Sequence, residues 1–125
     1  MTESGSNILV VDDNPFVLET TTLLLAGNGY NTVGCKDAAS ALDTFKAKGF
    51  DAVLTDVKMP GMSGLEVCRS IKSDPLLAHT RILILSCQGQ NFDWQLALEL
   101  GADGYITKPF DTGVLIDKVK ELSKR

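Results

Sequence analysis

The chain has 125 residues, of which 44% are hydrophobic, and 16 acidic against 12 basic side chains give it a formal net charge of -4. This length and apolar content suit one compact domain and exclude a disordered chain. The acidic balance argues against direct binding to nucleic acid, because a phosphate backbone calls for a basic surface. No apolar run is long enough to span a membrane, and residues 1–6 lack the basic start and apolar stretch of a signal peptide.

The cysteines and the histidine indicate the redox environment of the protein and the kinds of metal site it can have. The three cysteines, Cys35, Cys68 and Cys87, are an odd number and show no CxxC spacing. A reduced, cytoplasmic environment is the simplest interpretation. The single histidine, His79, argues against a metal site built from histidine and cysteine.

Strand-like and helix-like segments alternate along the chain. Short β-branched or apolar runs predict strands over residues 8–11, 30–35, 52–54, 82–85 and 105–107. Helical spacing and capping residues predict helices over about residues 15–27, 38–48, 64–73, 92–100 and 111–122. We expect residues 1–6 to form a flexible N-terminus and residues 7–125 to form a single domain.

This alternation predicts an α/β fold. Strands separated by helices form a parallel sheet that is covered by helices on both faces. For five such units the flavodoxin-like (βα)5 arrangement, with strand order 2-1-3-4-5, is the natural choice. It places strands one and three side by side at the switch point, where ligands of open α/β sheets bind.

Polar residues follow four of the predicted strands, and in this fold all of them lie at the same edge of the sheet. They are the pair Asp12-Asp13, then Asp56, Ser86 and Lys108. Each one alone is more often a helix cap, a turn former or a surface charge. Together, however, crowded carboxylates repel one another, and a divalent cation with a lysine would relieve that repulsion. Such a group suits phosphoryl transfer, with one carboxylate as the attacking nucleophile.

Three segments carry a resemblance to a known family. Residues 10–15 (VVDDNP), 54–64 (LTDVKMPGMSG) and 101–110 (GADGYITKPF) resemble the receiver domains of two-component response regulators. The segments occur in the right order and at the right spacing. The resemblance covers nearly the whole chain, from the first strand through the last helix.

The resemblance implies a role for each acidic residue. Asp56 matches the aspartate that accepts a phosphoryl group from the phosphohistidine of a sensor histidine kinase or a histidine phosphotransfer protein. Asp13 matches a direct Mg²⁺ ligand and Asp12 a ligand that acts through water. Asp56 itself and the backbone carbonyl of Lys58 complete the implied metal site.

The resemblance also implies a switch. Ser86 matches the residue that bonds a phosphoryl oxygen, and Lys108 matches the lysine of the family. Tyr105 matches an aromatic residue that turns inward as Ser86 moves toward the phosphate. The face formed by the fourth helix, fifth strand and fifth helix is then expected to control a partner.

The predicted fourth helix has two sides. We expect Leu96, Ala97 and Leu100 to point inward. Trp94 and Leu98 lie outside this inward-facing side of the helix. With Tyr105, they are expected to contact an output partner or a second copy of the chain. For Trp94 the alternative is that the ring packs over neighbouring loops.

Other functions are compatible with parts of the pattern. An aspartate-nucleophile phosphatase commonly has a second acid two residues after the nucleophile, where this chain has Lys58. A flavodoxin-like cofactor site would need a phosphate loop after the first strand, where Asp12-Asp13 would repel a phosphate. A degenerate receiver would lack part of the acidic set.

We therefore expect a signalling switch that is no enzyme beyond its own phosphorylation and dephosphorylation. The cognate kinase, the output, and whether the chain acts alone or within a longer protein are left open.

Overall fold

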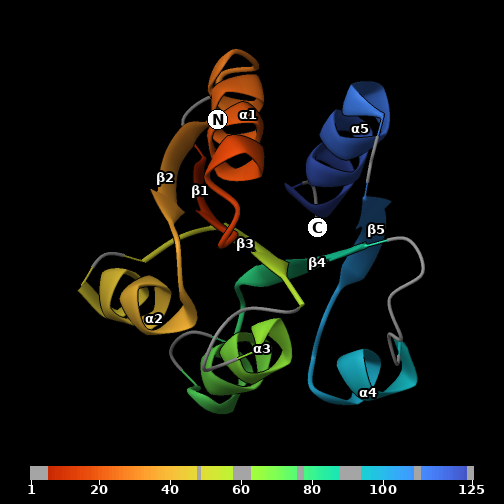
Figure 1. Ribbon diagram of the computed structural model, residues 1–125. Coiled ribbons are helices and arrows are strands. Elements are labelled where there is room, and N and C mark those ends of the chain that lie inside the picture. Colours follow the sequence, from red (N-terminus) through yellow and green to blue (C-terminus); the bar gives the residue numbers. More distant parts are fainter. Residues whose placement is uncertain are drawn as a thin grey trace.

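The computed structural model describes residues 6–47, 49–57, 63–75, 78–87, 94–108 and 111–123, and for residues 87, 94, 108 and 123 it describes the backbone alone. Strands and helices alternate through the chain as predicted (Figure 1). They are β1 (Asn7–Val11), α1 (Pro15–Ala26), β2 (Asn31–Cys35), α2 (Ala38–Ala47), β3 (Ala52–Asp56), α3 (Gly64–Ser73), β4 (Arg81–Cys87), α4 (Trp94–Glu99), β5 (Gly104–Lys108) and α5 (Thr112–Ser123). None of the described helices has the length and apolar character needed to cross a membrane.

The five strands form one parallel sheet in the order β2-β1-β3-β4-β5, which confirms the predicted order. Val11 at the end of β1 pairs with Thr55 of β3, and Asp56 pairs with Leu85 of β4. The carboxyl ends of β1, β3 and β4 are therefore level with one another. Because β1 and β3 are neighbours although β2 lies between them in sequence, the switch point lies at these two ends.

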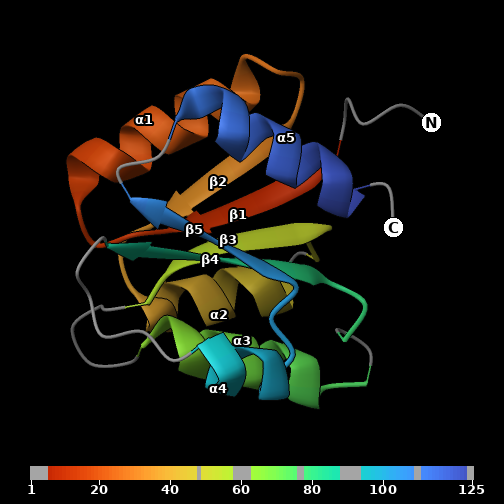
Figure 2. The same ribbon diagram turned by 90° about the vertical axis from the view of Figure 1, so that its right-hand side faces the viewer.

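Helices cover both faces of the sheet. Helices α1 and α5 lie on one face, and α2, α3 and α4 lie on the other (Figures 1 and 2). Alternate residues of β1 enter the two cores: Ile8 and Val10 pack beneath α1 and α5, whereas Leu9 and Val11 pack beneath α2 and α3. A strand that is buried on both faces reads as a continuous apolar run, which explains why these strands were visible in the sequence.

Side-chain caps fix where the helices begin. The Asn14 side chain accepts hydrogen bonds from two backbone N–H groups in the first turn of α1, at 2.9 and 3.2 Å. Asp37 accepts one from the N–H of Ser40 at 2.7 Å, and this bond holds the pKa of Asp37 below its usual value. Ser63 accepts one from the N–H of Glu66 at 3.4 Å. All three caps were predicted. Asn14 and Asp37 lie within three residues of the carboxyl ends of β1 and β2, so α1 and α2 begin close to that edge of the sheet, whereas residues 57–62 separate β3 from the Ser63 cap of α3 in the sequence.

Helix α4 departs from the prediction at one residue. Ala97 is fully buried and Leu98 is 45% exposed, as expected. Leu96, however, is 39% exposed, so its inward placement was wrong. Successive helical residues are about 100° apart, so a helix that turns Ala97 toward the core leaves Leu96 at the margin. Residues 92–93, where the helix was predicted to start, and the side chain of Trp94 lie outside the described part of the chain.

Candidate functional site

Three carboxylates meet at the carboxyl ends of β1 and β3. Since Val11 pairs with Thr55, the next residues along, Asp12 and Asp56, stand opposite each other. One oxygen from each of Asp12, Asp13 and Asp56 lies within 4.8 Å of the others. Asp12 is fully buried, Asp56 is 5% exposed, and Asp13 is exposed. The structure thus brings together the three acids singled out from the sequence, which we call the acidic centre.

Backbone contacts fix Asp12 in place. Its N–H donates to the carbonyl of Cys35 at 3.1 Å, and its Oδ1 accepts from the N–H of Asn14 at 2.9 Å. Helix α1 begins at Pro15, so its N-terminus, the positive end of the helix dipole, adjoins the acidic centre. This placement partly offsets the cost of bringing negative charges together.

Asp56 is held by a close approach between two backbones. The hydroxyl of Thr55 donates to the Asp56 carbonyl at 3.1 Å, and the N–H of Gly64 donates to the carbonyl of Val57 at 2.8 Å. At Gly64, the first residue of α3, an added Cβ would overlap the carbonyl oxygen of Asp56. Helix α3 therefore packs directly on the backbone of the central carboxylate.

The sequence did not reveal the roles of Thr55 and Gly64. The available signal was a glycine at the first position of a predicted helix, where glycine is a poor helix former. The reason for a glycine at position 64 becomes clear only from the structure, which shows the backbone of Asp56 directly beside it.

The structure describes the remaining predicted residues to different extents: some with their side chains, some by the backbone alone, and some not at all. Ser86 is 4% exposed and directly follows Leu85, which pairs with Asp56, so it lies at the same edge of the sheet. The backbone of Lys108 pairs with Cys87 at the end of β5. The side chain of Lys108 and the whole of Lys58 lie outside the described residues. Tyr105 is 42% exposed and is turned outward in this structure.

The acidic centre fits a small divalent cation. Mg²⁺ takes oxygen ligands at about 2.1 Å, so two opposite ligands lie about 4.2 Å apart. Oxygens that all lie within 4.8 Å of one another are close enough to share one such ion. A carboxylate-only donor set favours Mg²⁺ over metals that prefer nitrogen or sulfur.

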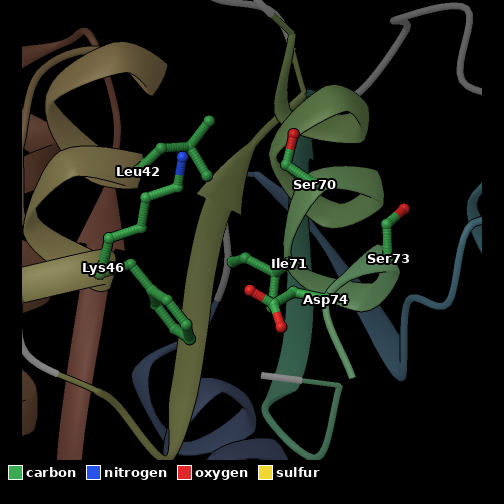
Figure 3. A pocket seen from close by; sticks show the side chains of 7 residues that line it. Leu42, Lys46, Ser70, Ile71, Ser73 and Asp74 are labelled. Atoms are coloured by element: carbon green, nitrogen blue, oxygen red, sulfur yellow. The ribbon is translucent and has the colours of Figure 1, made fainter. Parts of the chain in front are cut away.

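A hollow lies between α2 and α3. It has a volume of about 360 Å³, and Figure 3 shows Leu42 and Lys46 of α2 facing Ile71 of α3 and Asp74, the residue after α3, across it. These residues come from the carboxyl-terminal turns of the two helices or directly after them. Because a helix in a parallel α/β unit runs opposite to the strands, this hollow lies toward the amino ends of the strands, away from the acidic centre.

The fold and the acidic centre define a class of protein: a CheY-like signalling domain with carboxylates at its switch point. The family model for the response regulator receiver domain matches residues 8–120. The chain belongs to this family. It is accordingly a signalling module rather than an enzyme, and the family implies phosphorylation-based two-component signalling.

Curated relatives extend beyond this chain. The transcriptional regulatory protein CseB of Streptomyces coelicolor is 34% identical over 120 residues, a match covering 96% of this chain and 50% of CseB. The DNA-binding response regulator MtrA of Mycobacterium tuberculosis is 37% identical over 118 residues, covering 94% of this chain and 50% of MtrA. The chain thus spans about half the length of these relatives.

Solved structures match the whole domain. A response regulator receiver domain protein from Clostridium thermocellum aligns with a TM-score of 0.87 and 30% identity, covering 96% of this chain and 95% of that one. The chemotaxis protein CheY4 of Vibrio cholerae aligns with a TM-score of 0.89 and 26% identity, covering 94% of this chain and 98% of that one.

Proposed function

We propose that this domain is a switch that is turned on when Asp56 accepts a phosphoryl group from a phosphohistidine. The observation that carries the proposal is the acidic centre, in which a nearly buried carboxylate has two further carboxylates within 4.8 Å. An oxygen of Asp56 would form the new O–P bond while the P–N bond of the donor histidine breaks and the imidazole leaves with the electron pair. The donor would be a sensor histidine kinase or a histidine phosphotransfer protein.

The same residues would hold Mg²⁺. Asp12, Asp13 and Asp56, with the backbone carbonyl of Lys58, are the proposed ligands. Bound Mg²⁺ would supply neutralisation of the charge on the phosphoryl oxygens. Without the cation, Asp12 and Asp13 would repel the incoming phosphate, so phosphorylation should depend on the metal.

Phosphorylation would act through Ser86 and Lys108. A phosphoryl group adds charge and strong acceptor oxygens at Asp56. A hydroxyl at Ser86 and an ammonium at Lys108 would contact those oxygens in only one arrangement of their segments, and this difference shifts the equilibrium between two conformations. Tyr105, which is exposed in this structure, would turn inward in the phosphorylated state.

Phosphoryl transfer can be measured by intact mass. The protein is incubated with acetyl phosphate and Mg²⁺, and we expect one added phosphoryl group. The adduct should disappear in Asp56→Asn, which lacks the nucleophile, and in samples without Mg²⁺, and it should be strongly reduced in Asp13→Asn. Asp43→Asn, on α2, serves as a matched control and should be labelled like the wild type. An adduct that persists in Asp56→Asn would refute the proposal.

The face around β5 is the proposed output surface. β5 is an edge strand, and exposed apolar side chains lie on it and on the helices that flank it. Leu98 of α4 is 45% exposed, Tyr105 of β5 is 42% exposed, and Val114 of α5 is 50% exposed. We propose that Trp94, Leu98 and Tyr105, the partner face, contact either a second copy of the chain or an output partner. Direct contact with nucleic acid by this domain is not proposed, since the net charge is -4.

The partner face predicts phosphorylation-dependent self-association. Beryllofluoride with Mg²⁺ mimics the phosphorylated state, and sedimentation velocity then reports the size of the protein. We expect Leu98→Ala to weaken any beryllofluoride-dependent dimer about tenfold, the cost of losing one anchoring apolar side chain from an interface. Leu23→Ala, on α1 and 63% exposed, removes a leucine that is even more accessible than Leu98 and should leave the dimer unchanged. Equal dimer strength in the two variants would contradict the assignment of this face to self-association.

A further inference from the structure

Helix α3 holds the segment that joins α4 to β5 at three places. The thiol of Cys68 donates to the carbonyl of Leu100 at 3.4 Å. The ammonium of Lys72 lies 3.3 Å from Oδ2 of Asp103. The stem of Lys72 also lies against Gly101, where an added Cβ would come within 2.6 Å of its Cγ and where φ is +103°. We call Cys68, Lys72, Gly101 and Asp103 the α3–α4 clamp.

Asp103 extends the clamp to β4. Its Oδ2 accepts from the N–H of Ile82 at 2.8 Å, and its own N–H donates to the carbonyl of Ile82 at 2.9 Å. Oδ1 lies 3.6 Å from the guanidinium of Arg81. The side chains of Asp103 and Lys72 are only 15% and 17% exposed, so salt screens their ion pair less than it would a surface pair. The start of β5 is therefore tied to both α3 and β4.

The carboxyl end of α4 is closed by its own backbone as well. The N–H of Gly101 donates to the carbonyl of Leu98 at 3.0 Å, and the N–H of Ala102 donates to the carbonyl of Ala97 at 2.9 Å. This pair of bonds, with a left-handed glycine, is the Schellman motif. Ala97 and Ala102 are both buried, so the end of the helix is packed as well as hydrogen-bonded.

The position of the clamp relates it to the partner face. Leu98 lies two residues before Leu100, and Tyr105 lies two residues after Asp103. Leu98 and Tyr105 therefore flank residues 100–103, the segment that α3 and β4 hold in place. A packed, charge-paired segment of this kind is suited to stay fixed while the exposed residues on either side of it move.

We propose that the α3–α4 clamp is a fixed pivot, which holds residues 100–103 against α3 in both states of the switch while the partner face changes around it. This inference rests on the proposed function, because it needs two states. Burial raises the pKa of the Cys68 thiol to about 11, so the thiol keeps its proton at neutral pH and remains a donor to Leu100. Lys72 is the positioning residue that connects α3, Gly101 and Asp103.

Amide hydrogen exchange of the 125-residue chain, followed by NMR, tests the pivot. The amides of Gly101 and Ala102 are the reporters, since their hydrogen bonds close the end of α4. In the wild type we expect their protection to stay within about twofold when Mg²⁺ and beryllofluoride are added, while the chemical shifts of Leu98 and Tyr105 change. In Lys72→Met, which keeps the stem and removes the charge, we expect exchange at both amides to rise about tenfold.

Matched variants separate the ion pair from general effects. Asp103→Asn removes the ion pair with Lys72, and also the one with Arg81, while keeping an oxygen for the N–H of Ile82. Because the Lys72 pair is common to both substitutions, the double variant should lose less protection than the sum of the two single variants. Lys120→Met, on the exposed side of α5, should exchange like the wild type. Unchanged exchange in both clamp variants would overturn the proposal.

The result with beryllofluoride distinguishes two failures. Loss of protection at Gly101 and Ala102 in the beryllofluoride-bound wild type would show that this end moves, which overturns the pivot and leaves the proposed function intact. Absence of beryllofluoride binding, judged from the fluorine NMR spectrum, would overturn the proposed function and with it the pivot.

Discussion

Gly64→Ala is expected to lower the free energy of unfolding by about 3 kcal/mol, the upper part of the range for forcing extra atoms into a packed region, and to abolish phosphorylation of Asp56. The added Cβ would overlap the carbonyl oxygen of Asp56 and lie 3.1 Å from the hydroxyl oxygen of Thr55. Neither neighbour can yield easily, because one is backbone and the other is a buried side chain that donates to that backbone. Relief requires α3 to move away, which breaks the bond from Gly64 to Val57.

Urea denaturation and the acetyl phosphate assay measure the two effects separately. Gly49→Ala is the matched control, since an added Cβ there meets nothing within 4 Å. Its midpoint should lie close to that of the wild type, and its labelling should be normal. If Gly64→Ala matched Gly49→Ala in both assays, the close approach of α3 to the acidic centre would be wrong.

Phe45→Ala is expected to lower the free energy of unfolding by about 3–5 kcal/mol, as is usual when a buried aromatic ring is deleted. Phe45 is 1% exposed in the core beneath α2 and α3, and its ring centroid lies 5.9 Å from that of Phe50. The loss combines the transfer of the ring to water with the cavity left in a packed interior.

The chain offers its own control for this substitution. Phe16, on α1, is 77% exposed, so Phe16→Ala should change the stability by no more than about 0.5 kcal/mol. Both variants can be compared by urea denaturation at equal protein concentration. A loss in Phe16→Ala as large as that in Phe45→Ala would mean that α1 packs against something other than the sheet.

Much of the fold could be predicted because nearby residues in the sequence mark where each strand ends and each helix begins. β-branched runs end at Asp12 and Asp56, and caps such as Asn14 and Ser63 follow where helices begin. Five such units allow few arrangements of a parallel sheet with right-handed crossovers. Leu96 shows the limit: in a helix as short as α4, periodicity cannot decide which side of Ala97 meets the core.

The acidic centre could be predicted for a different reason. Asp12, Asp13 and Asp56 each follow a strand, and a parallel sheet brings such positions to one edge. Gly64 and Thr55 escaped notice because their importance lies in the distance between two backbones, which neither composition nor spacing records. The roles of the individual residues remain predictions: phosphoryl acceptance by Asp56, the metal and phosphate contacts of Lys58, Ser86 and Lys108, and the partner face of Trp94, Leu98 and Tyr105.

The register between β1 and β3 also determines when the acidic centre exists. Asp12 and Asp56 meet only after the intervening chain, with β2 and two helices, has been closed into a loop, and loop closure costs entropy that the unfolded chain has not yet lost. In the unfolded chain Asp56 is therefore too far from Asp12 and Asp13 for the three carboxylates to bind one ion together. A cation bound at the centre is bound by the native state alone, so by mass action every increment of its affinity adds to the stability of the fold.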